Sequence, residues 1–441
     1  MRESSAPRWA LSLYSLAWRL LLPLALLRLW WRGRREPLYR AHLGERLGRY
    51  AAPERDAGAP LLWVHAVSLG ETRAVAPLLD ALRAQRPGLR ILLTHMTASG
   101  RDAGRALLRA DDLQVWLPYD LPGALRRFLQ RFRPELGVLM ETEVWPNLLA
   151  VCADAGVPLL LANARLSPRS AARWARWPRL ATAAFGAIDS AAAQTEDDAA
   201  RLRALGVREV TVAGNLKFDR HSDPKLHALG LRWRAAVAPR PVLVLASTRE
   251  HQGIAEEALL LDALPAALRA RVLIVLVPRH PPRFDAVARL ARDRGLRVQR
   301  RSIGLPDAGT DVWLGDTLGE MSAYFAMADA AFVGGSLLPL GGQNLIEACA
   351  EGCPVVMGPS SFNFAQAAEQ AAAAGALRRA ADAAGVWSAL QTWLDQPQQR
   401  VSAQQAALAF SAAHRGAAVQ HAAWIGARLD APGGGLGQQP Q

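Results

Sequence analysis

From about residue 60 onward, short apolar runs alternate with helical segments that are rich in alanine and arginine. Runs of this length, separated by helices, predict βαβ units in which parallel strands are covered by helices on both faces. The fold class predicted is therefore α/β, with two tandem Rossmann-like doubly wound domains that face a central cleft. The runs of the first series are "PLLWVHAV", "RILLTHMT", "LGVLMETE", "PLLLANARL" and "SAAAQTE", and those of the second are "PVLVLAST", "RVLIVLVPRH", "VWLGDT", "AAFVGGS" and "CPVVMGP".

The stretch between the two series, "AGNLKFDRHSDPKL", is polar and turn-rich, and it predicts an interdomain linker around residues 216–240. The first domain is expected at residues 36–220 and the second at residues 221–425. They are preceded by a membrane-associated helix at residues 1–35. The low-complexity end of the chain predicts a disordered tail at residues 426–441.

The opening apolar segment runs from Trp9 to Trp31 and is interrupted by Arg19, Pro23 and Arg28. About 20 apolar residues span a bilayer, but an arginine near the centre of a span costs about 2.5–3.5 kcal/mol. A single span and an interfacial helix with snorkelling arginines are therefore both open readings. A cleaved signal peptide and a buried core helix are weaker alternatives. Two tryptophans followed by arginines end the segment, which is typical of an aromatic and basic belt on the cytoplasmic side.

Charge is concentrated near the start of the chain. The net charge is +13, and residues 1–50 hold ten arginines and three glutamates, a net of +7. An acidic partner is expected, but nucleic acid is disfavoured because the charge lies beside the apolar segment and no aromatic-basic RNA motif occurs. The three cysteines lack the paired spacing of a zinc site and indicate a reducing compartment.

The stretch "AFVGGSLLPLGGQNLIEACAEG" places four glycines between an apolar strand and a helix expected to begin at Asn344. Backbone N–H groups of such a loop and of the helix start predict a cradle for a phosphate, with Glu347 placed to bind ribose hydroxyls. The alternative is a simple tight turn with a solvated Glu347. The dinucleotide fingerprint and the phosphate loop of nucleotide triphosphatases are absent, which disfavours hydride and phosphoryl transfer.

Other polar residues also follow predicted strands. Arg279, His280 and Arg283 form a cationic group for a phosphate or a base, unless they are solvated loop residues. Glu71 follows a strand at a helix start, where a carboxylate takes a proton from an attacking hydroxyl or caps the helix.

Glu141 and Glu143 follow another strand, with a helix cap as the alternative for Glu143.

Lysine and asparagine are rare enough in this chain for their positions to carry weight. Lys217 is one of only two lysines, and it favours a substrate carboxylate or phosphate. Asparagine occurs five times, and we expect its copies to serve geometry or chemistry.

With these motifs in order, the chain resembles the 3-deoxy-D-manno-octulosonic acid (Kdo) transferases of Gram-negative bacteria, from Trp30 to about Gln420. Several motifs match in the same order, which makes the resemblance specific. They are "RGRREPLYRAHLGERLG", "HAVSLGET", "LPYDLPGALRRFL", "METEVWPNLL", "LANARLSPRSA", "AAQTEDDAARLRALG", "GNLKFD", "VPRHPPRF", "GDTLGEM", "AFVGGSL" and "GPSSFNF".

The resemblance implies a membrane-associated GT-B glycosyltransferase that moves Kdo from CMP-Kdo to the lipid A precursor, with inversion and without a metal or cofactor. It implies a location on the cytoplasmic face of the inner membrane, against its anionic lipids. The family's general base falls on Glu71, and the transition-state groups fall on Glu141 and Lys217. The N-terminal domain would bind the acceptor. Contacts to the CMP-sugar fall on Pro278, Arg279, Leu318, Gly319, Glu320, Asn344, Leu345, Ile346 and Glu347.

The chain departs from the family pattern at a few donor-site positions. Gln343 stands where the family usually has histidine, Ser360 also replaces a common histidine, and "ASTREHQGIAEE" differs from a more compact motif. Two other functions stay open: a GT-B enzyme that uses a UDP-sugar, and a non-catalytic nucleotide-binding membrane adaptor. The number of Kdo residues transferred and the oligomeric state are left open as well.

Overall fold

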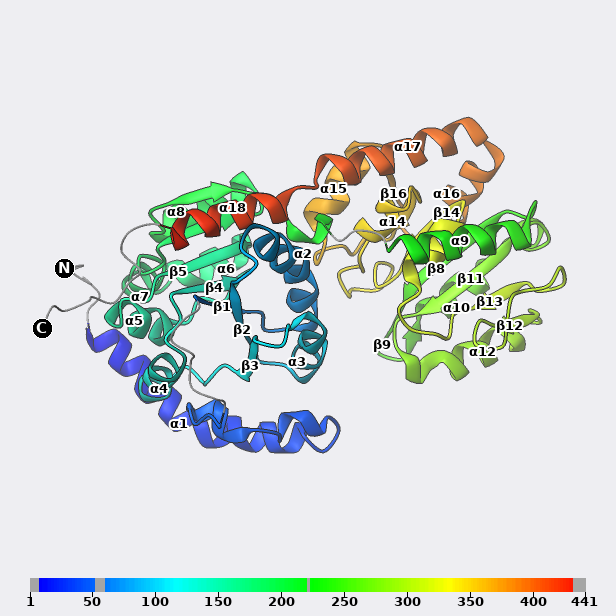
Figure 1. Ribbon diagram of the computed structural model, residues 1–441. Helices are drawn as coiled ribbons and strands as arrows, with labels where there is room; N and C mark the ends of the chain where they lie inside the picture. Colours follow the sequence, from blue (N-terminus) through cyan, green and yellow to red (C-terminus); the bar gives the residue numbers. More distant parts are fainter. Residues whose placement is uncertain (1–7, 52–59, 220–222, 431–441) are drawn as a thin grey trace, which may run out of the picture. The chain divides into compact units, whose positions relative to one another are not determined.

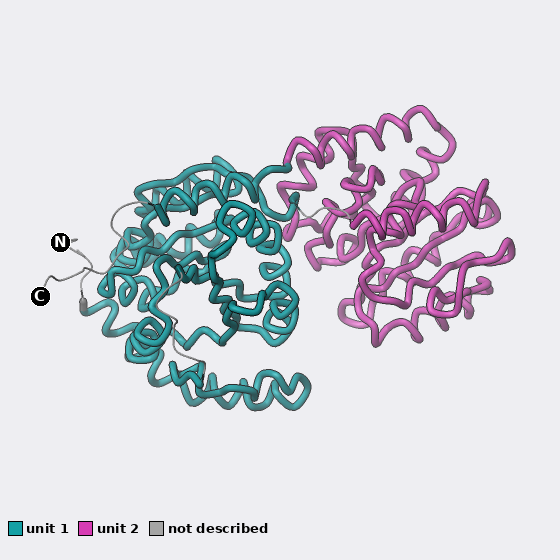
Figure 2. The backbone as a smooth tube through the Cα atoms, viewed as in Figure 1, with its two compact units in different colours: residues 1–219, 415–441 teal, residues 220–414 magenta. Residues whose placement is uncertain are grey.

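The computed structural model describes residues 8–51, 60–219 and 223–430. The chain forms two compact units, which Figure 1 and Figure 2 show by sequence and by unit. Unit 1 comprises residues 1–219 and 415–441, and unit 2 comprises residues 220–414. Each unit has an α/β architecture built on one seven-stranded sheet, as the sequence predicts.

The sheet of unit 1 is parallel throughout, with strand order β3-β2-β1-β4-β5-β6-β7. The chain builds the sheet outward from β1 in one direction and then returns to β4 and builds in the other, so β1 and β4 lie at the switch point. The strands are β1 (Leu61–His65), β2 (Arg90–His95), β3 (Leu113–Trp116), β4 (Leu136–Met140), β5 (Leu159–Ala164), β6 (Ser190–Ala193) and β7 (Val210–Val212).

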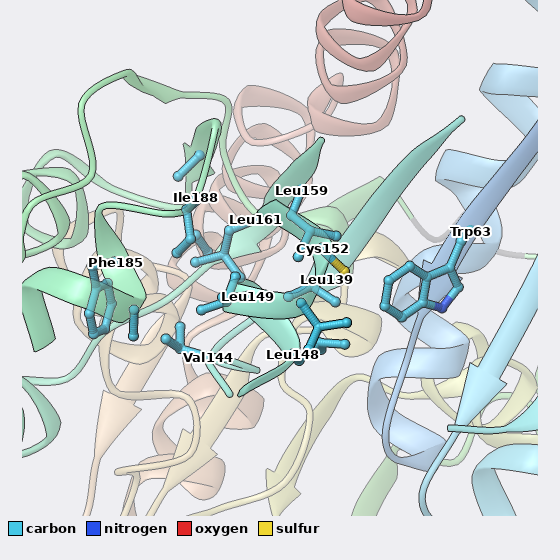
Figure 3. Packing of buried hydrophobic residues seen from close by; sticks show 14 of the residues in the cluster. Trp63, Leu139, Val144, Leu148, Leu149, Cys152, Leu159, Leu161, Phe185 and Ile188 are labelled. Carbon is cyan, nitrogen blue, oxygen red and sulfur yellow. The ribbon is translucent and has the colours of Figure 1, made fainter. Parts of the chain in front are cut away.

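The central strands of unit 1 are apolar at nearly every position because both faces of the sheet are covered. Leu61 and Trp63 belong to the core on one face, whereas Leu62 and Val64 belong to the core on the other. Figure 3 shows the first of these cores, where Trp63 and the leucines of β4 and β5 pack against α5.

The helices of unit 1 begin at side chains that favour helix starts. Ser68, Thr97, Ser167 and Thr195 each accept a hydrogen bond from a backbone N–H in the first turn. The α-helices are α1 (Arg8–Arg32), α2 (Leu69–Gln85), α3 (Ala98–Gly104), α4 (Pro122–Phe132), α5 (Pro146–Asp154), α6 (Pro168–Ala175), α7 (Pro178–Phe185), α8 (Glu196–Leu205) and α18 (Ala417–Leu429). The 3₁₀ turns are η1 (Pro37–Tyr39), η2 (Leu43–Leu47), η3 (Arg105–Leu107) and η4 (Leu216–Asp219).

The end of the chain returns to unit 1, which differs from the expected domain bounds. Residues 415–425 were placed in the second domain, but α18 packs on α2 and β5 because its apolar face, with Ala422 and Ile425, is buried there. The Nε2 atom of His421 accepts a hydrogen bond from the backbone N–H of Asn163 at 3.0 Å. Residues 426–429 are part of α18 rather than of a tail, and the rest of the predicted tail, 431–441, lies outside the described residues.

Unit 2 contains a second parallel sheet, with strand order β12-β13-β11-β8-β14-β15-β16 and its switch point between β8 and β14. The small hairpin β9–β10 is antiparallel. The strands are β8 (Val242–Thr248), β9 (Glu250–His251), β10 (Ile254–Ala255), β11 (Leu273–Pro278), β12 (Val298–Arg300), β13 (Val312–Leu314), β14 (Ala330–Val333), β15 (Val355–Met357) and β16 (Leu377–Arg379).

The helices of unit 2 cover both faces of its sheet, and α16 packs on β14 and β15. The α-helices are α9 (Pro224–Val237), α10 (Glu256–Asp262), α11 (Ala266–Arg269), α12 (Phe284–Asp293), α13 (Met321–Met327), α14 (Ile346–Ala350), α15 (Ala365–Ala373), α16 (Ala383–Asp395) and α17 (Pro397–Ala413). The 3₁₀ turn is η5 (Pro281–Arg283).

The boundary between the units, after Asp219, falls inside the predicted linker, but most of that range is not a linker. Residues 224–237 form α9, which packs on α13, and its Trp233 is 4 % exposed against the ring of Trp313. Asp223 caps this helix, and Pro224 begins it. The polar composition of the stretch therefore concealed a helix with one large apolar anchor.

Candidate active site

Glu71 lies in the first turn of α2, immediately beyond the carboxyl end of β1 and the switch point of unit 1. Its Oε1 accepts a hydrogen bond from the Ser68 hydroxyl at 2.8 Å, and its Oε2 accepts one from the Val67 N–H at 2.9 Å. The Glu71 N–H in turn donates to Ser68 Oγ at 3.4 Å. This is a capping box, so the side chain caps its helix and still lies at the predicted site.

The surroundings of Glu71 favour its neutral form. Burial raises the pKa of Glu71 to about 7, the hydrogen bonds from Ser68 and Val67 oppose that shift, and the carboxylates of Glu141 and Glu143 add to it. The side chain is 9 % exposed. A carboxyl group with a pKa near neutrality is well matched to accept a proton from a hydroxyl at physiological pH.

Glu141 is the first residue after β4, the strand beside β1 in the sheet. Its backbone has a φ of 56°, a left-handed conformation that is rare for a residue with a long side chain and is often retained at functional sites. Its carboxylate lies 3.0 Å from Lys217 Nζ in a half-buried ion pair. The sequence named both residues as site candidates, and the structure brings them together.

Lys217 is held in place by a polar network around η4. The side-chain oxygen of Asn163, at the end of β5, accepts a hydrogen bond from the backbone N–H of Leu216 at 3.0 Å. That of Asn215 accepts one from the backbone N–H of Lys217, also at 3.0 Å. Asn163 also has a left-handed φ of 51°, which asparagine tolerates better than most residues do. The network fixes the ammonium group beside Glu141.

Sequence reasoning assigned a role to Asn344 alone among the five asparagines, although the scarcity of this residue type was a signal for all of them. Each of the five asparagine side chains makes at least one hydrogen bond to a backbone group: Asn147, Asn163, Asn215, Asn344 and Asn363. Glu143 does not cap α5, because its carboxylate accepts a hydrogen bond from the Trp145 indole at 2.8 Å instead.

In unit 2, the predicted donor residues follow three strands on either side of β8. Pro278 ends β11, and the exposed Arg279 comes next, with its N–H bonded to the Thr248 carbonyl at 3.0 Å. The segment from Leu318 to Glu320 follows β13, and Gly319 has a positive φ of 86°. The remaining residues, 344–347, follow the glycine loop after β14.

The glycine loop differs from the expected cradle in its first half. The N–H groups of Gly335, Ser336 and Leu337 donate to the carboxylate of Glu256 at 2.6, 3.0 and 3.0 Å. An internal anion therefore occupies these amides. A fourth N–H, from Arg249, donates to the same carboxylate at 2.9 Å.

The second half of the loop leaves backbone N–H groups without an internal partner in the part of the chain that the structure describes, and the residues Gln343 and Asn344 are partly exposed whereas Leu345 is buried. The N–H groups of Gln343, Asn344 and Leu345 make no hydrogen bond among the described residues. The helix starts at Ile346 rather than at Asn344, whose Oδ1 accepts the Ile346 N–H at 3.1 Å. Glu347 is therefore in the first turn of α14, and it accepts a hydrogen bond from the Ser322 hydroxyl at 3.0 Å.

Arg283 is not available as the cationic contact that the sequence suggested. It forms two hydrogen bonds of 2.8 Å to the carboxylate of Glu257, whose side chain is fully buried, and it also pairs with Glu250. Neither Glu256 nor Glu257 was named from the sequence. A signal was present in "ASTREHQGIAEE", where two acids follow a glycine at the start of a helix, but the spacing alone did not reveal their partners.

Comparisons with known proteins agree with these motifs. Residues 41–220 match the family model described as 3-deoxy-D-manno-octulosonic-acid transferase (kdotransferase). A 3-deoxy-D-manno-octulosonic acid transferase of Bordetella pertussis is 47% identical over 418 residues, 92% of this chain and 96% of its own. One from Haemophilus influenzae is 36% identical over 342 residues, 75% of this chain and 78% of its own.

Among solved structures, a glycosyltransferase from Rickettsia africae superposes with a TM-score of 0.57, covering 85% of this chain and 99% of its own at 12% identity. At that identity the likeness shows the fold alone, and the fold is of the GT-B type. The relatives of similar sequence lead to one assignment: the chain belongs to the family of 3-deoxy-D-manno-octulosonic acid transferases.

Proposed function

We propose that the protein is an inverting, metal-independent glycosyltransferase that moves Kdo from CMP-Kdo to a lipid A precursor on the cytoplasmic face of the inner membrane. Membership of the Kdo transferase family supports the sugar and the reaction type. The observation that carries the mechanism is the position and environment of Glu71 at the switch point of unit 1.

In this mechanism Glu71 takes the proton from a sugar hydroxyl of the acceptor. The hydroxyl oxygen then attacks the anomeric carbon of Kdo on the face opposite the phosphate, the bond from that carbon to the CMP oxygen breaks, and CMP leaves. One positioned base is worth about 10²–10⁴ in rate. At pH 7 a carboxyl group with a pKa of about 7 is half ionised, so it can both take and release the proton.

The Glu141–Lys217 pair supplies a charge partner close to the base. Lys217 compensates the charge of Glu141, one of three carboxylates at this site, and so limits the repulsion by which Glu141 raises the pKa of Glu71. An ammonium group held in this way also attracts the carboxylate of the Kdo unit. We assign the pair to binding and stabilising the charge that develops during transfer.

The donor is assigned to unit 2, at the carboxyl ends of β11, β13 and β14. The exposed Arg279 and the unbonded N–H groups of the partly exposed Gln343 and Asn344 support a site for the CMP phosphate. Leu318, Gly319 and Glu320 form the turn beside it. That both substrates meet in one cleft stays a prediction.

The test is a transfer assay with the purified protein, CMP-Kdo and a lipid A precursor. We expect a product heavier by one or more Kdo units, an inverted anomeric configuration by NMR, and undiminished turnover in EDTA. CMP should protect the protein against thermal unfolding more than UDP does. Protection by UDP alone would support a UDP-sugar enzyme, and CMP protection without any turnover would support the non-catalytic adaptor.

A further inference from the structure

Helix α1 carries two different faces along its whole length, and Trp9–Arg32 is long and apolar enough to cross a membrane. One face points toward unit 1, and its buried or half-buried residues recur every three or four positions, at 11, 15, 18, 22, 25 and 29. The opposite face is exposed and almost entirely apolar. Its residues are 50–70% exposed: Leu13, Leu16, Leu20, Leu24, Leu27 and Trp31.

The inward face is attached to unit 1 by polar side chains as well as by apolar packing. The Ser15 hydroxyl lies 2.8 Å from Oδ1 of Asn147 in α5, and the Trp18 ring stacks on Tyr119 with centroids 5.8 Å apart. Trp18 also donates to the Tyr14 hydroxyl at 2.7 Å. Near the other end of the helix, Leu29 is 8 % exposed.

These contacts conflict with a transbilayer position of α1. A spanning helix would have to leave α5 and α7 and surround Ser15, Tyr14 and Trp18 with lipid. The Oδ1 atom of Asn147, in a residue that is 2 % exposed, would then lose its hydroxyl partner. With the contacts kept, the apolar face lies along one side of unit 1, which suits a helix in the plane of the membrane interface.

A basic surface lies on α7, which contacts α1, and on α6, which contacts α7. Residues 155–188 contain no acid, and Arg169, Arg173, Arg176 and Arg179 are all exposed. Their side chains make no ion pair among the described residues. Trp177, between them, is 67% exposed, and α7 packs against α1 (Figure 1). Exposed arginines and a tryptophan beside an apolar stripe match the headgroup region of an anionic membrane.

We propose that α1 lies flat in the membrane interface, docked on unit 1, and that the arginines of α6 and α7 bind lipid phosphates beside it. The proposal deepens the membrane location in the proposed function, because it states which surface meets the lipid and how. The occupant is an anionic lipid surface, since the patch combines unpaired positive charge with a continuous apolar stripe.

The first experiment determines on which side of the membrane the start of the chain lies. The three native cysteines are buried, so a Ser5→Cys variant in cells with a permeabilised outer membrane gives a clear signal from an impermeant maleimide. We expect labelling only after the inner membrane is opened, as for the control Ser402→Cys on α17. Labelling of Ser5→Cys in intact inner membranes would show that α1 spans and would overturn the proposal.

The second experiment measures binding of the full-length protein to vesicles, with and without phosphatidylglycerol, in the absence of substrates. Arg173→Ala with Arg176→Ala should lower the affinity for anionic vesicles about tenfold to thirtyfold, from about 1 kcal/mol per arginine near such a surface. The matched control, Arg289→Ala with Arg292→Ala on α12 of unit 2, removes the same charge and should bind like the parent protein.

The remaining outcomes all bear on the proposal. Equal losses in both double variants, or equal binding to neutral vesicles, would contradict the role of α6 and α7. Stable dimers with no vesicle binding would assign the leucine stripe to a second copy of the chain. A rise in KM for the acceptor with unchanged vesicle binding would assign the arginines to substrate phosphates. Because the labelling, vesicle-binding and oligomer readouts need no turnover, they stand whether or not the proposed transfer reaction is confirmed.

Discussion

Two glutamates occupy corresponding places in the two units but have different environments. Glu71 and Glu256 each lie in the first turn of the helix that begins after the first strand of its sheet, at the switch points β1/β4 and β8/β14. Glu71 is 9 % exposed and accepts bonds from its own segment, from Ser68 and Val67. Glu256 is fully buried and accepts four backbone N–H groups from two segments.

The number of hydrogen-bond donors distinguishes a carboxylate that can exchange a proton from one that holds two loops together, at the same position of the fold. A carboxylate with two partners keeps free lone pairs and can exchange a proton, whereas one bound to four amides acts as a cross-link between loops. Burial raises the pKa of both side chains, so the pKa direction alone does not distinguish them. The number and origin of their hydrogen-bond donors do.

Removing the charge of Glu71 should have the largest effect. Glu71→Gln keeps the shape, its oxygen can keep the bond from the Val67 N–H, and its NH₂ group can donate to the Ser68 hydroxyl oxygen. An amide takes up no proton, so we expect the rate of transfer to fall by about 10²–10⁴. CMP affinity and the urea midpoint should stay near those of the parent protein. Single-turnover kinetics with CMP-Kdo and the acceptor measure the rate. Turnover like that of the parent would remove Glu71 from the role of base.

The same substitution at Glu256 should act on structure instead. In Glu256→Gln one oxygen becomes an NH₂ group that faces two N–H donors, and each buried donor left unpaired costs about 1–3 kcal/mol. We expect urea unfolding to show a loss of about 2–5 kcal/mol, together with weaker CMP binding in calorimetry. A variant with normal stability and CMP affinity but with lost turnover would contradict the comparison, because Glu256 would then be the chemical group.

The sequence predicted one of these glutamates and not the other for a physical reason. Glu71 follows a strand and begins a helix within a short motif, so its place could be read locally. The role of Glu256 depends on hydrogen bonds from amides about 80 residues further along the chain, and the local sequence "IAEE" does not indicate those partners. The glycines predict a backbone cradle, but no local pattern predicts that the Glu256 carboxylate occupies its first half.

The strands show a similar limit. All ten apolar runs named from the sequence are strands, and they are the five central strands of each sheet. Six strands were missed: the two short strands of the hairpin β9–β10, and the edge strands of the two large sheets, β3, β7, β12 and β16. Each edge strand leaves some of its residues half-buried or exposed, as in Val298–Arg300, so none forms a continuous apolar run.

A smaller change should tune Glu71 without replacing it. The proposed base works only when it is ionised, so if Glu71 has that role the rate of transfer should fall as the pH drops below its pKa of about 7. The Glu143 carboxylate raises that pKa, so Glu143→Gln should move the acid limb of kcat/KM to lower pH with little loss at the plateau. An acid limb that stays in place, or moves upward, would show that Glu143 does not act on the base.

The smallest effect is expected from an exposed member of the Glu256 and Glu257 cluster. Glu250 is about half exposed and lies 3.4 Å from Arg283 Nε, while Arg283 is already fixed by two bonds to the buried Glu257. Exposed ion pairs are worth about 0–1 kcal/mol, so Glu250→Gln should change the free energy of unfolding by less than about 1 kcal/mol and leave CMP affinity unchanged. Urea unfolding beside Glu256→Gln gives the direct contrast. If both variants lost equal stability, the loss in Glu256→Gln could not be attributed to burial and the number of amide donors. The net charge in this region of unit 2 would then explain both losses.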